Sequence, residues 1–185
     1  MKHLLFIALT SALLLACGGS TKTPMKGDLY PPEYEAVLTD LPYNIQFNKR
    51  AEYHYIDSQS EYRTIRLSYP DYQAEGNIAV VMVDSARLLP TIERSLRHLE
   101  VNSDTACTIE SDHPEGGLRH WLFVHPNGKN QLSWMATDSL TMFLSGYIHL
   151  EAATDSTVDI TPALTNIQTD ITHLLNNLTV STASK

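Results

Sequence analysis

The stretch DITPALTNIQTDITHLLNNL, residues 159–178, has the most regular helical pattern in the chain. Asp159 is a candidate N-cap, and Pro162 lies in the first turn, where proline is tolerated. Apolar residues then recur every three or four positions: Ile160, Leu164, Ile167, Ile171, Leu174 and Leu178. Such a stripe must pack against a large apolar surface. The sequence offers one of sufficient size, a β-sheet formed by the preceding residues.

Alternating and β-branched runs predict the strands of this sheet. The clearest hairpin signal is Asn127-Gly128, which lies between two apolar runs. Another hairpin is expected from residues 62–69 and 78–83, with a turn over residues 71–76. The remaining expected strands cover residues 43–55, with a break near 48–50, and residues 106–111, 118–125, 131–136 and 142–151. Bulky aromatic residues are expected to fill the buried face of the sheet: Trp121, Phe123, Trp134 and Phe143.

A second helix is expected between these strands. Asp84-Ser85 offers an N-cap, and apolar residues then follow at helical spacing, namely Leu88, Ile92, Leu96 and Leu99. Because Pro90 would remove a hydrogen bond inside a helix, we expect the regular helix to begin near residues 88–90 and to run to about Val101. The predicted fold is therefore α+β: an antiparallel sheet of about six to seven strands with two helices packed on one face.

Residues 1–16 have the plan of a bacterial lipoprotein signal peptide. Lys2 precedes an apolar run that is too short to span a membrane, and Leu14-Leu15-Ala16-Cys17 forms a lipobox. We expect Cys17 to be the first residue of the mature chain and to carry acyl chains that anchor it in a membrane. Residues 17–40 show no sustained periodicity and are predicted to be a flexible tether. Residues 41–185 then form a single α+β domain.

Composition argues against several classes of function. The formal net charge is −8, so the surface is expected to repel phosphates and nucleic acid. The chain has two cysteines, and lipidation of Cys17 leaves only Cys107, so we expect no disulfide within the chain. No basic residue near Cys107 would activate its thiol, which favours a buried core residue over a reactive one.

The sequence contains no recognisable catalytic or metal-binding pattern. His113, His120 and His125 lie near Asp112 and Glu115, but their spacing matches no zinc pattern. Neither a Gly-x-Ser-x-Gly elbow nor a phosphate-binding glycine loop is present. We therefore expect no metal, no cofactor and no enzymatic activity.

Four stretches, in order along the chain, resemble one known family. They are Leu41-Pro42-Tyr43-x-Ile45-x-Phe47, then Leu67-x-Tyr69-Pro70-x-Tyr72, then Pro126-Asn127-Gly128 with Thr137-Asp138-Ser139-x-x-x-Phe143-Leu144-x-Gly146, and finally Asp170-Ile171-x-His173-Leu174-Leu175-Asn176-x-Leu178. Behind a lipobox, this series is similar to the gliding motility lipoproteins called GldD, from the Bacteroidetes.

The resemblance implies a non-enzymatic envelope protein that is needed for gliding and for the linked type IX secretion system. It implies contacts with other envelope proteins. Thr21-Lys22-Thr23 stand after the glycines in place of an acidic cluster that would favour export to the cell surface, so we expect the lipid anchor to hold the protein at the outer membrane, facing the periplasm. The third stretch supplies a candidate motif: Thr137, Asp138, Ser139, Phe143 and Gly146. Because Asp138 and Ser139 can accept hydrogen bonds from the backbone of their own turn, we expect a structural role before a partner contact.

A periplasmic lipoprotein that binds a small ligand is the alternative. Five tyrosines would form its aromatic lining, namely Tyr53, Tyr55, Tyr62, Tyr69 and Tyr72, although tyrosines in alternating strands are more often half-buried sheet residues. A deep apolar pocket with convergent polar groups would favour this alternative. A filled core with an exposed apolar patch would favour the interaction protein.

Covalent sugar is a candidate modification if the chain comes from the group in which the resembling family occurs. Bacteroidetes modify exported proteins at Asp followed by Ser or Thr and then a small or aliphatic residue. The hydroxyls that fit this rule belong to Ser85, Thr105, Ser139 and Ser156. Asp-Ser and Asp-Thr pairs are also common in helix caps and turns, so both interpretations of these pairs stay open.

Overall fold

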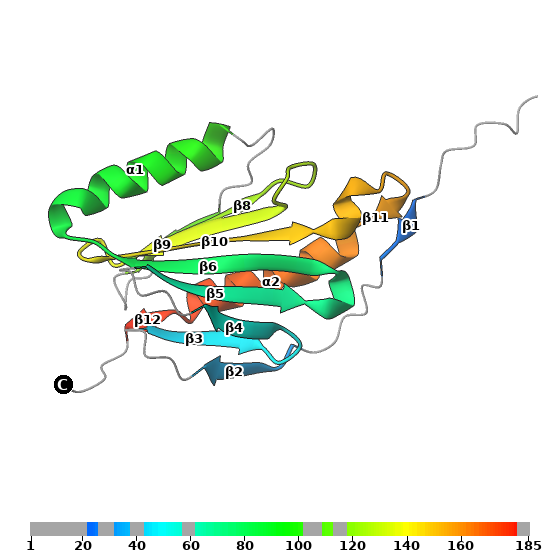
Figure 1. Cartoon of the computed structure of the whole chain (residues 1–185), viewed down its shortest axis with the longest axis horizontal. Helices are drawn as coiled ribbons and strands as arrows, with labels where there is room; N and C mark the ends of the chain where they lie inside the picture. Colours follow the sequence, from blue (N-terminus) through cyan, green and yellow to red (C-terminus); the bar gives the residue numbers. More distant parts are fainter. Residues whose placement is uncertain are drawn as a thin grey trace, which may run out of the picture.

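The computed structural model describes residues 22–25, 32–37, 43–56, 62–101, 109–112 and 118–180, and within them one antiparallel β-sheet organises the chain. Its strands lie in the order β4-β5-β6-β10-β9-β8-β7, and each neighbouring pair is antiparallel (Figure 1). Their bounds are β4, Glu52–Ile56; β5, Tyr62–Tyr69; β6, Ala74–Met82; β7, Ile109–Asp112; β8, Arg119–Val124; β9, Leu132–Thr137; and β10, Met142–Leu150. The expected α+β class, with two helices and an antiparallel sheet of six to seven strands, is confirmed.

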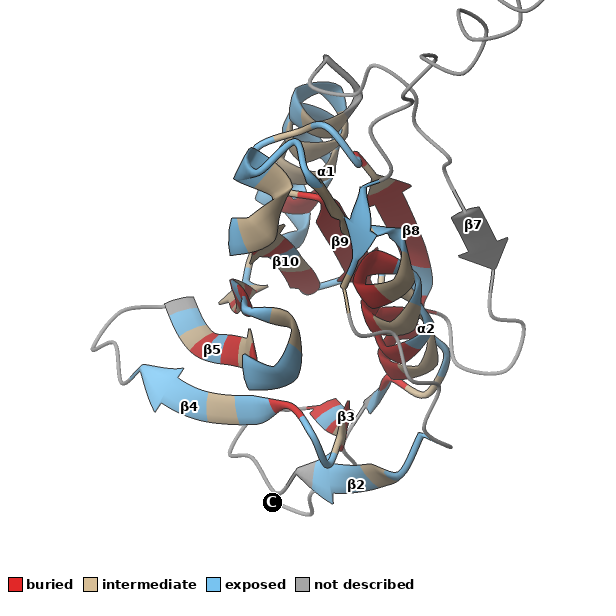
Figure 2. Cartoon of the chain, turned by 90° about the vertical axis from the view of Figure 1, so that its right-hand side faces the viewer, coloured by how far each residue is buried: buried red, intermediate tan, exposed pale blue. Residues whose placement is uncertain are grey.

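The helices α1 (Ser85–Val101) and α2 (Thr161–Asn176) cover opposite faces of this sheet, so the expectation that both pack on one face is wrong. Neighbouring residues of a strand point to opposite faces. In β8, Trp121 and Phe123 pack in the cluster that contains Leu88 of α1, whereas Leu122 packs in the cluster that contains α2. Figure 2 shows α1 and α2 on either side of β9. Every residue of β9 is buried, and a strand without a polar face must be covered on both sides.

The larger core lies between the sheet and α2. The residues of α2 that face it belong to the predicted stripe, namely Leu164, Ile167, Ile171 and Leu174, with Leu178 just beyond the helix. On the other side of α2, β3 (Tyr43–Asn48) contributes Tyr43, Ile45 and Phe47, all buried. The predicted break near residues 48–50 separates β3 from β4, so these two strands belong to different sheets.

Two short N-terminal segments pair with later parts of the chain. β2 (Tyr34–Val37) and β12 (Thr179–Val180) flank β3, and β1 (Thr23–Pro24) pairs in parallel with β11 (Val158–Asp159). The expectation that residues 17–40 form only a flexible tether is therefore wrong for β1 and β2. β2 is held to the domain by its ladder with β3 and because the Tyr34 hydroxyl donates a hydrogen bond to Asp170 of α2, at 3.0 Å.

α1 begins at Ser85, earlier than the position of Pro90 suggests. Asp84 caps its first turn, because its carboxylate and its carbonyl oxygen both accept a hydrogen bond from the Arg87 N–H at 3.0 Å. Pro90 lies in the second turn at the exposed surface. It removes one backbone hydrogen bond there, and the helix continues past it.

Gly76 lies inside β6 and not in the turn where the sequence pattern placed it. The turn is shorter than expected: Pro70–Tyr72 form one turn of 3-10 helix, Gln73 takes a left-handed conformation (φ 49°), and β6 begins at Ala74. A β-carbon on Gly76 would lie 1.8 Å from the backbone oxygen of Tyr147 in β10. Glycine is needed because the two backbones approach so closely.

Candidate functional site

An open groove of about 740 Å³ lies between α1 and the sheet face that α1 covers. Three parts of the chain that are distant in sequence form it: α1, the strands β6, β9 and β10, and the loop between β8 and β9. α1 contributes Arg94 and His98, the sheet contributes Asn77 and Tyr147, and the loop contributes Lys129. The volume is in the range typical of ligand-binding sites.

The groove is positively charged although the chain as a whole is acidic. The formal net charge of the chain is −8, yet none of the described residues that line the groove is Asp or Glu. Arg94 and Lys129 come from two different elements of the lining, α1 and the β8–β9 loop, and both are exposed at the surface. Cations gathered in a concave site raise the local concentration of anions. This arrangement therefore favours a negatively charged ligand.

His125 adds a buried polar atom to the lining of the groove. Its side chain is 8% exposed, its ring stacks on that of Phe123 with centroids 6.3 Å apart, and its Nδ1 has no hydrogen-bond partner among the described residues. Burial lowers the pKa of His125, so the imidazole is neutral at pH 7. A buried polar atom without a partner costs free energy. Because Nδ1 is inaccessible to solvent, it does not open onto the groove.

The loop that carries Lys129 is fixed to the neighbouring strand. Gln131 is buried, and its side chain donates a hydrogen bond to the Gly128 carbonyl at 2.5 Å and accepts one from the Leu150 N–H at 2.7 Å. The ring of His149 lies 2.6 Å from the Lys129 carbonyl oxygen. The Asn127-Gly128 signal correctly predicted a hairpin between β8 and β9. These contacts hold one wall of the groove in place.

The candidate motif Thr137-Asp138-Ser139 forms the tight turn between β9 and β10. One carboxylate oxygen of Asp138 accepts hydrogen bonds from the N–H groups of Leu140, Thr141 and Met142, each at 2.9 Å. The Thr137 hydroxyl donates to the Met142 carbonyl at 2.6 Å and accepts from the Ser139 N–H at 3.0 Å. The hydrogen bonding expected for Asp138 is confirmed. The other side chain that accepts a backbone hydrogen bond in this turn is that of Thr137.

The other two members of the motif lie in β10 after this turn, where Phe143 is the ladder partner of Thr137. Phe143 is buried beneath α1 in the cluster that contains Leu88. A β-carbon on Gly146 would lie 2.3 Å from the ring of Trp134, so glycine is required for the indole to pack there. The five motif residues therefore do not meet at one cavity, although Gly146 also lines the groove. A contact with a partner protein stays a prediction for this motif.

We predict that Asp138→Ala lowers the free energy of unfolding by about 1–3 kcal/mol, because three backbone N–H groups lose their acceptor. Burial alone would raise the pKa of Asp138, but these hydrogen bonds together hold it below its usual value. The stabilisation is therefore present above the pKa of the unfolded state and is lost as the pH falls through the lower pKa of the folded state. Urea denaturation at neutral and acidic pH measures both effects.

The control for Asp138→Ala is Asp71→Ala. Asp71 is exposed and pairs with Arg50 at 3.5 Å, so this change should alter stability by less than about 0.5 kcal/mol. A protein with Asp138→Ala that melts as the wild type but fails to support secretion would contradict a structural role and indicate a partner contact.

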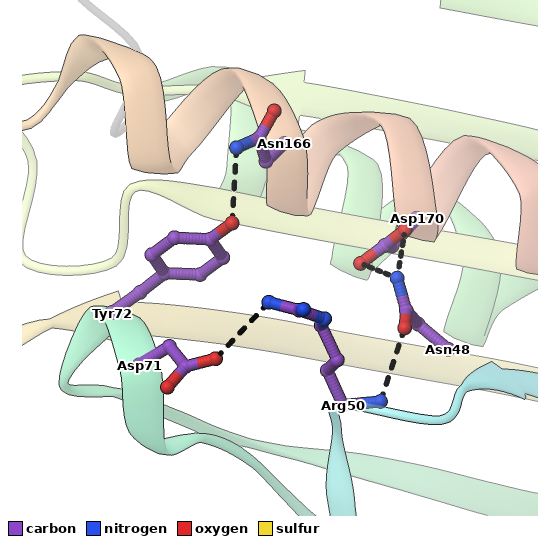
Figure 3. Close-up of polar contacts among 6 residues, drawn as sticks. All are labelled: Asn48, Arg50, Asp71, Tyr72, Asn166 and Asp170. Atoms are coloured by element: carbon purple, nitrogen blue, oxygen red, sulfur yellow. Dashed lines mark hydrogen bonds and ion pairs between the residues drawn. The ribbon is translucent and has the colours of Figure 1, made fainter. Parts of the chain in front are cut away.

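The C-terminal family-like stretch contains a second polar cluster, between α2 and β3. Asp170 is 7% exposed and accepts a hydrogen bond from the Tyr34 hydroxyl at 3.0 Å. It also accepts one from the Asn48 amide at 3.0 Å (Figure 3). Burial raises the pKa of Asp170. The Tyr34 ring stacks on that of His173, whose Nε2 lies 2.9 Å from Gln46 Oε1. The sequence analysis did not predict this cluster. Its one local signal was the acidic residue Asp170, which directly precedes Ile171 of the apolar stripe.

This cluster joins several elements of the domain, and hydrogen bonds occupy the carboxylate of Asp170. Figure 3 shows Asn48 between Asp170 and the backbone of Arg50, and Tyr72 in contact with Asn166 of α2. The bonds to Asp170 and Asn166 link α2 to β2, to β3 and to the turn before β6, whereas the bond to Arg50 lies within the turn after β3. The polar contacts thus position α2 on the domain, and we assign them a structural role.

The histidines and tyrosines named from the sequence do not form a site together. His120 and His125 are both buried, but they belong to opposite faces of the sheet, and the described residues contain no group of three metal-ligating side chains. His113, Glu115 and Cys107 lie outside the described residues. Among the tyrosines, Tyr69 is buried in the core and Tyr53 stacks on Phe47 with centroids 5.2 Å apart.

The predicted modification sites are exposed where the structure describes them. Ser85, Ser139 and Ser156 all lie at the surface, at the start of α1, in the β9–β10 turn and in the turn before β11. Thr105 and Cys17 lie outside the described residues. Glycosylation and lipidation of these residues stay predictions.

In the part of the chain that the structure describes, no helix has the length and apolar character needed to cross a membrane.

Comparison with known proteins gives one clear match. Among curated proteins, none matches the chain. The family model of the gliding motility lipoprotein GldD matches residues 21–180, which include every strand and helix described above. The resemblance inferred from the sequence is thereby confirmed. The chain belongs to the gliding motility lipoprotein GldD family.

Proposed function

We propose that this protein is an accessory component of the gliding motility and type IX secretion machinery, and that it acts through contacts with other envelope proteins. The observation that carries the proposal is the family match over residues 21–180, which associates the chain with gliding motility. The proposal adds the secretion system, the protein contacts and a position at the outer membrane facing the periplasm.

The distribution of apolar residues supports an interaction protein. The core between α2 and the sheet is filled with buried side chains, whereas Met82, Leu89 and Leu140 are 46%, 63% and 67% exposed. These three residues belong to the end of β6, the start of α1 and the β9–β10 turn, which lie at one end of the sheet (Figure 1). The Val83 N–H donates to the Thr141 carbonyl at 2.8 Å and joins two of these segments. Exposed apolar residues grouped in this way are typical of protein contact sites.

A non-enzymatic role is part of the proposal. The buried carboxylate of Asp170 and the half-buried carboxylate of Asp138 both accept several hydrogen bonds from their own structural surroundings. A general acid or base must have a proton position open to substrate. The sequence supplies no recognisable nucleophile motif in their place.

The proposed anchor is lipid on Cys17, and Cys17→Ala tests it. We predict that this variant accumulates as an unprocessed precursor that does not incorporate labelled palmitate, because the thiol is the acylation site. Fluorography of the immunoprecipitated protein after palmitate labelling measures this, with the wild type as the positive control. Palmitate in the Cys17→Ala protein would refute the anchor.

Deletion of the gene in the native host tests the proposed function. We expect the deletion strain to lose spreading on agar and to retain type IX cargo inside the cell. The measurement is the amount of cargo protein in the culture medium and on the cell surface. Normal spreading together with normal secretion would overturn the proposal.

Binding of a small ligand is the second candidate function, and the groove between α1 and the sheet is the observation that favours it. The tyrosines proposed for its lining, as far as their side chains are described, do not line this groove. The groove is open to solvent and carries cations at its lining, so it supports this candidate less well than it supports a protein contact.

A further inference from the structure

We propose that the groove between α1 and the sheet binds an acidic peptide segment of a partner protein. This inference rests on the proposed function, because it names the kind of partner segment that an accessory envelope protein would hold. It goes beyond the family match, which identifies no binding surface.

The charge distribution selects an anionic ligand. Arg94 of α1 and Lys129 of the β8–β9 loop both line the groove, and the described lining residues include no carboxylate. An acidic side chain in the groove would be attracted by both cations. The formal net charge of −8 on the whole chain makes a long polyanion such as nucleic acid unfavourable, whereas a short acidic segment avoids most of that repulsion.

The remaining lining suits a peptide held by side chains. β9 and β10 each pair with a strand on both sides, so the floor offers no unpaired strand edge for a peptide to extend. Hydroxyl and amide groups project along the floor and walls instead, from Ser95, Asn130, Ser133 and Ser145. Such groups can donate to peptide carbonyls and accept from peptide N–H groups. The Asn77 amide is already occupied, since it donates to the Tyr147 hydroxyl at 3.0 Å.

The test uses full-length lipidated protein in a neutral detergent and a fluorescein-labelled peptide of six glutamates, with binding followed by fluorescence anisotropy. We expect saturable binding that weakens as salt is added. Arg94→Glu and Lys129→Glu should each weaken binding about tenfold, because each exchanges an attraction for a repulsion. A peptide of six glutamines should bind at least tenfold more weakly than the glutamate peptide.

Arg97→Glu is the matched control. Arg97 is on the same helix as Arg94, but it does not line the groove and pairs instead with Glu93 at 3.8 Å. Peptide affinity should change less than twofold in this variant. Far-UV circular dichroism of all three variants should match the wild type, because all three positions are exposed.

Three outcomes would overturn the inference: no binding of the glutamate peptide, equal binding of the glutamine peptide, or equal loss of affinity in Arg97→Glu. Competition by citrate at a concentration below that of unlabelled peptide would instead assign the groove to a small anion. Each of these outcomes concerns peptide binding alone and is distinct from a failure of the proposed function. Loss of secretion in the deletion strain would still support that function if the peptide did not bind.

Discussion

Leu174→Asp should lower the free energy of unfolding by about 4 kcal/mol or more, enough to leave much of the protein unfolded. Leu174 is 1% exposed and lies in the apolar stripe of α2 that packs against the sheet. The change removes a buried aliphatic side chain and places a carboxylate where no cation compensates it among the residues of that core. Urea denaturation of the purified protein, followed by far-UV circular dichroism, measures the difference.

Thr169→Asp is the control for this prediction because it introduces the same carboxylate on the exposed side of α2. Its effect should be within about 0.5 kcal/mol. Asn177 would serve less well, because it is half-buried and its side-chain amide donates to the His173 carbonyl at 2.9 Å at the end of the helix, whereas the bond from the Thr169 hydroxyl to the Thr165 carbonyl is exposed. Equal stability of Leu174→Asp and Thr169→Asp would contradict the docking of α2 on the sheet.

Gly76→Ala should be the most disruptive single methyl addition in the sheet. The new β-carbon would lie 1.8 Å from the backbone oxygen of Tyr147 and 2.9 Å from Cδ1 of Ile148. A backbone atom cannot rotate away as a side chain does, so β6 and β10 must separate at the centre of the sheet. We expect a loss of about 3 kcal/mol or more, as for overpacked cores, measured by thermal and urea denaturation.

Gly128→Ala provides the comparison for Gly76→Ala. A β-carbon there would be 3.0 Å from the His125 β-carbon and 3.3 Å from two carbonyl oxygens, so a shift of a few tenths of an ångström relieves the contact. The loss should therefore be about 1 kcal/mol at most. If Gly76→Ala were as stable as Gly128→Ala, the close approach of β6 and β10 described here would be wrong.

Local patterns predicted the elements of this fold well. The stripe from Leu164 to Leu174 indicated α2 because helical spacing is a property of the stretch itself. The Asn127-Gly128 pair indicated the β8–β9 hairpin for a similarly local reason. Asp84 and Asp138 were predicted at a cap and a turn, where short acidic side chains accept backbone hydrogen bonds.

The arrangement of the elements was harder to predict because it depends on contacts between distant residues. Trp121, Leu122 and Phe123 are consecutive apolar residues, so their sequence does not show that two different helices cover the two faces of β8. The role of Gly76 depends on Tyr147, which is 71 residues later in the chain. β2 was missed because its pairing and the bond from Tyr34 to Asp170 are both long-range.

The groove was missed for the same physical reason. Its walls come from α1, three strands and one loop, and Arg94 alone resembles a solvated residue of a helix surface. The folded chain brings Arg94 and Lys129 to the lining of one groove, and none of the described lining residues is acidic. A single basic residue has no sequence signal that distinguishes a groove lining from an ordinary exposed surface. The unpaired nitrogen of His125 likewise depends on burial, which a sequence pattern does not report.

The central claim is that this lipoprotein acts from the envelope in gliding motility and type IX secretion, and complementation of the deletion strain tests it most directly. The measurement is the amount of type IX cargo on the cell surface in strains that carry the wild-type gene, the Cys17→Ala gene or no gene. We predict wild-type cargo levels with the wild-type gene, and loss of surface cargo with Cys17→Ala and with no gene. Normal surface cargo in the strain without the gene would contradict the claim.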